Sequence, residues 1–304
     1  MSAEPRTVTA QGLRFGYFEK GQGPLVLCLH GFPDTAHSFL ETLEVLAGHG
    51  FRAVAPFARG YPPSDAAPDR DYSILRLGRD ALALIEALGE KQAYLVGHDW
   101  GALAAYAAAA LAPDRILGIA TAAVPHLRAQ VARGLVPAQA RRSWYIGFFQ
   151  LPRIPEWRVP RHDFAFIDRL WRAWSPGWRH TPRDIEPVKA ALSQRGALAA
   201  ALGYYRALPK AMALDRSSRA SLLARVRPPA VTFAGVDDGC MGIEMFDRQA
   251  LGFSGPFRLV PIEGAGHFMH REQPAIFHRE LVEFLEELER ARRGSIRSRG
   301  FAGA

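Results

Sequence analysis

The amino-acid sequence predicts an α/β fold, in which a mostly parallel sheet is flanked by helices and interrupted by a helical insertion. Segments typical of strands and of helices alternate over residues 1–124, as they do in right-handed crossovers between parallel strands. This alternation stops over residues 125–213 and resumes over residues 214–304. A chain of 304 residues is long enough to bury a full hydrophobic core.

The first part of the core, residues 1–124, consists of short predicted elements. Continuous apolar runs predict strands that are buried on both faces, and apolar residues three or four positions apart predict amphipathic helices. The predicted strands are Leu13–Tyr17, Leu25–Leu29, Arg52–Pro56, Gln92–Val96 and Ile116–Val124; the predicted helices are Ser38–Leu46, Leu75–Leu88 and Ala102–Leu111; and Arg59–Asp65 is a predicted loop.

The insertion, residues 125–213, differs from the core in composition. It holds five of the six tryptophans, many arginines and several prolines, and it contains no clear strand pattern, so we expect helices there. The second part of the core, residues 214–304, follows it. Its predicted elements are strands Ala230–Ala234 and Phe257–Pro261, a helix near Ile243–Ala250 and a long helix from about Pro274 to Arg292.

The composition excludes several classes of protein. With 48% hydrophobic and 22% charged residues, the chain has enough apolar surface to fold. Its two cysteines, Cys28 and Cys240, are too few for a disulfide scaffold or a four-thiolate zinc site. The first residues have no apolar signal segment, and no run of about 18 apolar residues occurs. We therefore expect a cytoplasmic protein without a membrane partner.

The net charge of +8 is carried mostly by arginine, and five arginines lie within residues 290–299. Such a cluster can bind nucleic acid. No nucleic-acid-binding motif accompanies it, so we expect a solvated helix end, where cations are favourable, and no nucleic-acid partner. The pattern indicates no particular oligomeric state.

The motif Gly97-His98-Asp99-Trp100-Gly101 lies between a predicted strand and an Ala-rich helix. This arrangement is typical of a nucleophile elbow, a tight turn that lifts its central side chain above the sheet. An aspartate that merely caps the helix is the alternative, but the flanking glycines favour the elbow. Ester and amide hydrolases have serine at the centre. A carboxylate there would attack a saturated carbon that carries a leaving group, and would form an alkyl-enzyme ester.

Hydrolysis of such an ester needs a base that activates water. His267 follows the last predicted strand, where elbow folds place the base, and Asp238 follows the strand before it. Asp238 is therefore the preferred acid to orient His267, with the adjacent Asp237 as the alternative. His270 lies nearby, but no further set of histidine, cysteine or carboxylate residues completes a metal site in the sequence. We expect no metal and no cofactor.

The segment His30-Gly31-Phe32-Pro33-Asp34 follows the predicted strand Leu25–Leu29. In that position the backbone N–H groups of Phe32 and Trp100 can form an oxyanion hole for the tetrahedral intermediate of ester cleavage. We expect His30 to pack behind the site and Asp34 to cap the following helix.

The motifs HGFPD, RGYPPSD, GHDWGA and GAGHF, in this order, resemble those of the epoxide hydrolases of the α/β-hydrolase fold. The resemblance covers nearly the whole chain. It implies an aspartate nucleophile with a His–Asp pair, a cis peptide bond at Phe32–Pro33, and an insertion that forms a helical lid over the elbow. The resulting hypothesis is a cofactor-independent epoxide hydrolase.

The same resemblance implies two lid tyrosines whose hydroxyls hold the epoxide oxygen. Tyr145 lies five residues before the glutamine of a Phe-Gln-Leu-Pro segment, and Tyr205 lies in a Tyr-Tyr-Arg sequence in which Tyr204 is the alternative. A phenol with a pKa near 10 can donate a hydrogen bond to the developing oxyanion without competing as a nucleophile. Ordinary packing on the core is the alternative role for these rings.

The aromatic residues of the insertion suggest an apolar pocket. Trp100, Phe32, Trp144 and Phe149 are the residues that we expect to line it. The expected substrate is a small or medium apolar epoxide, and water is the second reactant.

Two other functions remain open from the sequence. Haloalkane dehalogenases share GHDWG but hold the departing halide with N–H donors; the side chain of Phe32 offers none, whereas Trp100 has one. Fluoroacetate dehalogenases carry an arginine after the nucleophile, and this chain has none there. A non-catalytic binding protein of this fold is a weaker alternative, because Asp99, Asp238 and His267 are all present.

Overall fold

The computed structural model describes residues 4–211 and 215–301, and the side chains of residues 4–210 and 215–294. The expected boundary between the insertion and the second part of the core, at residues 213 and 214, lies outside the described residues. So do the side chains of Arg297 and Arg299.

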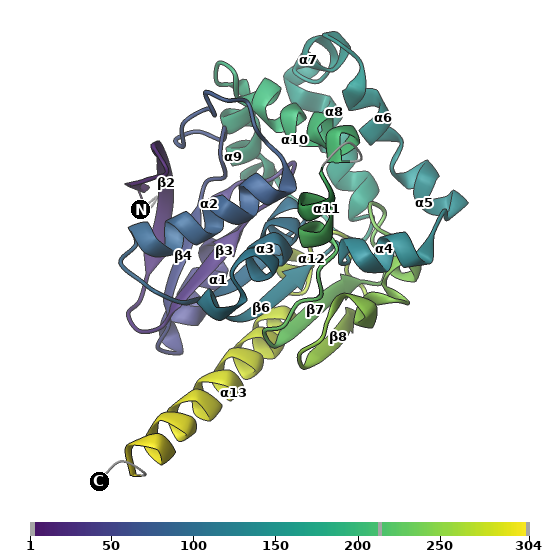
Figure 1. Cartoon of the computed structure of the whole chain (residues 1–304). Coiled ribbons are helices and arrows are strands. Elements are labelled where there is room, and N and C mark those ends of the chain that lie inside the picture. Colours follow the sequence, from purple (N-terminus) through teal and green to yellow (C-terminus); the bar gives the residue numbers. More distant parts are fainter. Residues whose placement is uncertain (1–3, 212–214, 302–304) are drawn as a thin grey trace.

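One eight-stranded sheet forms the centre of the molecule, with the strand order β1-β2-β4-β3-β5-β6-β7-β8 (Figure 1). The first two strands pair antiparallel, β2 also pairs antiparallel with β4, and the remaining pairs are parallel. The mostly parallel sheet is confirmed. The strands are β1 (Arg6–Ala10), β2 (Leu13–Lys20), β3 (Leu25–Leu29), β4 (Arg52–Pro56), β5 (Ala93–His98), β6 (Ile116–Ala122), β7 (Ala230–Gly235) and β8 (Phe257–Ile262).

Helices cover both faces of this sheet. On one side α2 (Ile74–Ala87) packs against α3 (Trp100–Leu111), and on the other α1 (Leu40–Gly48) contacts α13 (Pro274–Phe301). The residues on the inner faces of strands and helices form one large hydrophobic cluster. Because both faces are covered, β3, β5 and β7 are buried along their whole length, which explains their continuous apolar runs.

The insertion is helical in its described part, residues 125–211, where no strand occurs. In Figure 1 its helices gather at one end of the sheet. The helices between β6 and β7 are α4 (Leu127–Arg133), α5 (Pro137–Arg142), α6 (Trp144–Gln150), α7 (Ile154–Arg158), α8 (Arg161–Trp174), α9 (Pro182–Ser193), α10 (Ala197–Ala211) and α11 (Arg216–Leu222).

The observed secondary structure differs from the sequence analysis at β1, at residues 243–252 and at the turn after β3. The edge strand β1 was missed, because only Ala10 of its five residues is buried and the apolar signal is weak. The predicted helix Ile243–Ala250 is instead two 3₁₀ turns, since Gln249 turns inward and donates to the hydroxyls of Tyr106 and Thr232. The residue that caps the turn after β3 is Thr35 rather than Asp34.

The long C-terminal helix α13 extends beyond the sheet (Figure 1). Arg292 and Arg293 on this helix form ion pairs with Glu289, a buried residue that also accepts a hydrogen bond from the Tyr94 hydroxyl. Within residues 4–211 and 215–301, no helix is long and apolar enough to cross a membrane.

A buried ion pair fixes the loop that carries Arg59. Both oxygens of Asp80, on α2, accept hydrogen bonds from the Arg59 guanidinium, and the Arg59 carbonyl accepts one from the Tyr204 hydroxyl on α10. The Arg59 side chain has no exposed surface. The ion pair therefore joins the loop after β4 to the core helix α2, and the Tyr204 hydrogen bond joins the same loop to the insertion.

We expect Asp80→Asn to lower the free energy of unfolding by about 3–5 kcal/mol, because it leaves the Arg59 charge buried without its anion. Urea denaturation followed by circular dichroism measures this loss. Asp114→Asn is the matched control: it breaks the exposed pair with Arg227 and should cost less than about 1 kcal/mol. Equal losses in the two variants would contradict the role assigned to Asp80.

Candidate active site

The backbone at Asp99 forms a tight turn between β5 and α3. Asp99 has φ 52° and ψ −115°, a conformation that residues other than glycine rarely adopt. The flanking glycines are required by close approach. A side chain at Gly97 would collide with the Gly101 carbonyl, and one at Gly101 would collide with the carbonyl of Leu29. This geometry presents the Asp99 side chain at the carboxyl end of β5.

The Asp99 carboxylate is buried and held by a backbone donor. Its Oδ1 accepts a hydrogen bond of 2.9 Å from the Phe32 N–H, and the neighbouring Trp100 N–H favours its charged form. Burial raises the pKa of Asp99, while the nearby His267 and the two N–H groups oppose that shift. The other oxygen, Oδ2, faces His267.

His267 lies in the loop after β8, between two carboxylates. Its Nδ1 is 2.9 Å from Oδ2 of Asp238, and its Nε2 is 3.7 Å from Oδ2 of Asp99. Burial alone would lower the pKa of His267, but the charge of Asp238 and the hydrogen bond to it outweigh burial and raise the pKa well above its usual value. Because the carboxylate accepts from Nδ1–H, the Nε2 lone pair of the neutral ring points toward Asp99.

The Asp238 side chain is fixed by the loop after β7. Its Oδ1 accepts backbone N–H bonds of 2.6 Å from Cys240 and 2.9 Å from Met241. The adjacent Asp237 has an exposed side chain, and the structure brings Asp238, not Asp237, to His267.

Two phenols from the insertion face this cluster. Tyr145 on α6 and Tyr205 on α10 are buried, with ring centroids 5.7 Å apart. Burial raises the pKa of both hydroxyls well above 10, so each remains a proton donor. The Tyr205 hydroxyl has no hydrogen-bond partner among the described residues. The Tyr204 hydroxyl instead donates to the Arg59 carbonyl and is already satisfied.

The aromatic neighbours of Tyr205 form an apolar wall. Phe32, Phe149 and Trp100 each contact its ring, with centroids 5.0–5.2 Å away. Trp144 is placed differently. Its side chain is 47% exposed and its ring contacts Phe148 and Phe166 instead of the two tyrosines, so the geometry gives no support to its predicted place in the pocket.

Sequence analysis missed Cys240 and Trp174 at this site. The Cys240 thiol is 3.3 Å from the Tyr145 hydroxyl, and the Trp174 ring contacts both Tyr145 and His267. The sequence offered one indication that Cys240 lies at the site. It is two residues after Asp238, and residues in the same loop as the acid lie close to the site as well. Nothing in the sequence distinguishes Trp174 from the other tryptophans of the insertion.

A cavity of about 910 Å³ lies beside the cluster, between the loop before α2 and helix α10. Trp100 and Tyr204 line it, and Trp100 follows Asp99 directly. The reacting groups themselves are closely packed, and none of Asp99, His267 and Tyr205 lines this cavity. Trp100 connects the cavity lining to the cluster, because its ring also contacts Tyr205.

Comparison with known proteins agrees with this geometry. A family model described as alpha/beta hydrolase fold matches residues 24–274. Epoxide hydrolase A of Mycobacterium tuberculosis is 32% identical, over 93% of this chain and 98% of that protein. The AB hydrolase superfamily protein YfhM of Bacillus subtilis is 30% identical, over 87% and 91%.

A solved structure gives the same result. The crystal structure of an epoxide hydrolase from Vigna radiata is 27% identical, covers 93% of this chain and 98% of that chain, and superimposes with a TM-score of 0.79. The chain therefore belongs to the α/β hydrolase fold family, and its relatives in that family include proteins named epoxide hydrolase.

Proposed function

We propose that this protein hydrolyses an apolar epoxide to a vicinal diol, with Asp99 as nucleophile and the insertion as a lid over it. One observation carries the proposal: two buried phenols from the insertion, Tyr145 and Tyr205, face a carboxylate whose other neighbour is a His–Asp pair. The relatives named epoxide hydrolase support the same activity.

The first step opens the epoxide ring. Oδ2 of Asp99 attacks a ring carbon, a new C–O ester bond forms, and the bond from that carbon to the ring oxygen breaks. The oxygen takes a proton from the hydroxyl of Tyr145 or Tyr205. These donors lower the barrier because they stabilise the negative charge that develops on the oxygen.

The second step cleaves the ester with water. Ester formation removes the Asp99 charge, which favours the neutral form of His267; its Nε2 proton passes to the tyrosinate left by the first step, and Nε2 is then free to accept a proton from water. Hydroxide adds to the ester carbonyl, and the N–H groups of Phe32 and Trp100 stabilise the resulting oxyanion. The bond between carbonyl carbon and alkoxide oxygen then breaks, the alkoxide takes the proton of the new carboxylic acid, and the diol leaves with Asp99 ionised and His267 protonated as at the start.

A substrate must pass from solvent to the closely packed cluster. The 910 Å³ cavity supplies a route, with Trp100 and Tyr204 at its inner wall. The wall of Phe32, Phe149 and Trp100 around Tyr205 favours an apolar substituent on the epoxide.

Single-turnover hydrolysis of styrene oxide in ¹⁸O-labelled water tests the proposal. With enzyme in excess, the diol should carry no ¹⁸O, because its second oxygen comes from Asp99, and the label should appear in the peptide that contains Asp99. Label in the first diol would contradict the ester mechanism. Turnover of 1-bromohexane but of no epoxide would assign the protein to the dehalogenases instead.

The two adjacent tyrosines should respond differently to loss of the hydroxyl. We expect Tyr205→Phe to lower kcat by about 10²–10³-fold with little change in stability, because one oxyanion donor is lost. Tyr204→Phe is the matched control: it removes the bond to the Arg59 carbonyl and should cost about 1 kcal/mol of stability while kcat stays within a few-fold. Steady-state kinetics and urea denaturation measure the two effects. The reverse pattern would exchange the roles of Tyr204 and Tyr205.

A further inference from the structure

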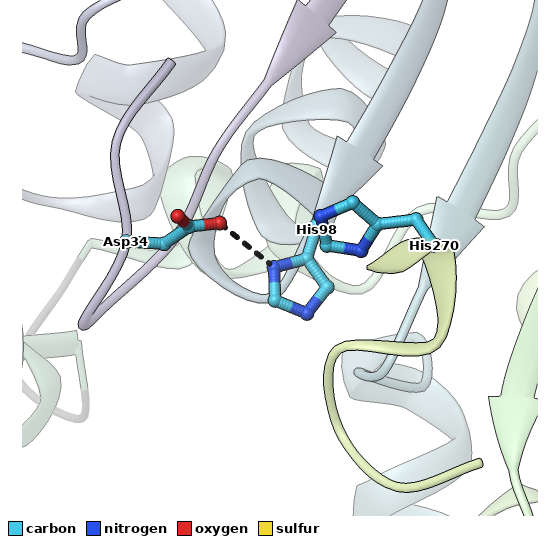
Figure 2. Close-up of side chains that lie close together, drawn as sticks. All are labelled: Asp34, His98 and His270. Atoms are coloured by element: carbon cyan, nitrogen blue, oxygen red, sulfur yellow. Dashed lines mark ion pairs between the residues drawn. The ribbon is translucent and has the colours of Figure 1, made fainter. Parts of the chain in front are cut away.

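A second cluster of buried polar side chains consists of Asp34, His98 and His270 (Figure 2). Asp34 follows β3, His98 ends β5, and His270 lies in α12 (Met269–Glu272). Their exposed fractions are 2%, 1% and 1%. Each offers one ligand-type atom, and these atoms lie within 4.8 Å of one another. The reaction proposed above uses none of the three.

The hydrogen bond of His98 fixes which of its nitrogens is free. Its Nε2 lies 2.9 Å from the backbone carbonyl of His267, and a carbonyl only accepts, so Nε2 carries the proton. In the neutral ring, Nδ1 then has a lone pair, and it faces Oδ2 of Asp34 at 3.9 Å (Figure 2). With Asp34 ionised, two acceptors face each other in a buried space, an arrangement that is costly unless a proton or a metal cation lies between them.

His270 adds a third donor atom. Neither of its ring nitrogens has a hydrogen-bond partner among the described residues, although the ring is buried. The ring stacks on Phe39 and lies 4.7 Å from the ring of His98, centroid to centroid. In a neutral imidazole one nitrogen carries a proton and the other has a lone pair. His270 therefore has one unused acceptor nitrogen that can bind a metal ion beside His98.

We propose that Asp34, His98 and His270 bind one divalent transition-metal ion, with Zn²⁺ as the first candidate. Two imidazoles and one carboxylate are a ligand set that suits Zn²⁺ and leaves a fourth position for water. A cation there balances the Asp34 charge and accepts the facing lone pairs.

The hydrogen bonds around the ligands support the proposal. In metal sites, a ligating histidine donates its other N–H to a carbonyl or carboxylate, and a ligating carboxylate accepts further bonds. His98 donates to the His267 carbonyl in this way. Asp34 accepts bonds of 2.7 Å from the Thr35 N–H and 2.6 Å from the Ser38 hydroxyl.

The ion would join three segments that are far apart in the sequence. Asp34 shares its loop with Phe32, His98 precedes Asp99, and His270 lies three residues after His267. A bound ion would therefore stabilise the relative positions of the loops around the nucleophile and the base. Local sequence indicates no metal-ligand set beside His270, because Asp34 and His98 lie far from it along the chain and the sheet brings them together.

Metal binding by the untagged full-length protein tests this directly. The protein is treated with a chelator, dialysed, and titrated with Zn²⁺ or Co²⁺; bound metal is measured by mass spectrometry, and the Co²⁺ form by visible absorption. We expect about one equivalent per chain, a higher Tm with metal, and d–d bands of nitrogen and oxygen ligation. Absence of bound metal and of any metal-dependent rise in Tm would overturn the proposal.

The spectrum also separates this site from the neighbouring set of Asp238, Cys240 and His267, whose ligand-type atoms also lie within 4.8 Å. Binding there would give an intense thiolate-to-cobalt band in the near ultraviolet. That band, abolished by Cys240→Ser, would place the ion at the reacting groups and contradict the assignment to His98 and His270.

A matched pair of variants locates the ion. His270→Gln should weaken metal binding by at least about 100-fold, because it removes a ligand. His278→Gln is the control, since His278 is a buried histidine whose Nε2 lies 3.0 Å from the Thr42 hydroxyl, outside the set. It should bind metal as the unmodified protein does. Equal metal binding by the two variants would overturn the assignment. The amount of bound metal can be compared even if one variant is less stable than the other.

Discussion

Asp99→Ala is expected to lower epoxide turnover by more than about 10⁴-fold, the largest effect of any single change in the protein. The methyl group of alanine cannot form the ester. The remaining His267–Asp238 pair can still activate water, but the water would have to attack the epoxide itself. Initial rates with styrene oxide measure the loss.

The backbone at Asp99 makes a folding control necessary. Alanine at φ 52° is strained by roughly 1–2 kcal/mol, and the N–H group of Phe32 loses its acceptor. Circular dichroism and Tm therefore accompany the assay. Asp237→Ala is the matched control, because it removes an exposed carboxylate from the same edge of the sheet and should retain full activity. Turnover by a folded Asp99→Ala variant would show that Asp99 is not the nucleophile.

Local patterns were sufficient to predict the core of this fold. Runs such as Leu25–Leu29 are apolar because helices cover both faces of the sheet, and a short apolar run between turn residues is typical of such a buried strand. The elbow was predictable for a similar reason: Gly97 and Gly101 are required by contacts that lie within a few residues of Asp99 or on the adjacent strand β3. The fold class and the relationship to epoxide hydrolases are accordingly confirmed.

Features that depend on distant contacts were not predictable in this way. Tyr204 and Tyr205 are equivalent in the sequence, and only the Arg59 carbonyl, brought in from the loop after β4, distinguishes them. The neighbours of His270 are another case. Asp34 and His98 lie far from it in the chain, and the assembled sheet edge creates the cluster. Which side chains meet at such an edge is set by strand order, which local periodicity does not encode.

In the proposed reaction, the two carboxylates around His267 determine at which step His267 can act as a base. Before the ring opens, Asp99 and Asp238 both stabilise the protonated imidazole, and the base is held back. Once Asp99 is esterified, only Asp238 remains charged, and the neutral imidazole becomes more favourable. We therefore expect His267 to be needed for the second step of the proposed reaction much more than for the first, in which Asp99 would attack without a base.

His267→Gln is consequently expected to accumulate the ester rather than to prevent its formation. Turnover should fall by about 10²–10⁴-fold, the usual contribution of a general base, while the first ring opening continues. The glutamine amide can still donate to Asp238, which limits the structural damage. Intact mass after exposure to styrene oxide should increase by the whole mass of the epoxide, because ring opening expels no leaving group.

Peptide mapping should place that added mass on the segment that contains Asp99. The double variant Asp99→Ala/His267→Gln is the control and should acquire none. A mass gain of an alkyl group without its halogen, from 1-bromohexane alone, would indicate dehalogenation. Absence of an adduct from the folded single variant with either compound would show that His267 is not the base of an ester-forming enzyme. If His267 acts as a base only after Asp99 has been esterified, replacing His267 blocks hydrolysis of the ester but not its formation. The covalent intermediate should therefore accumulate.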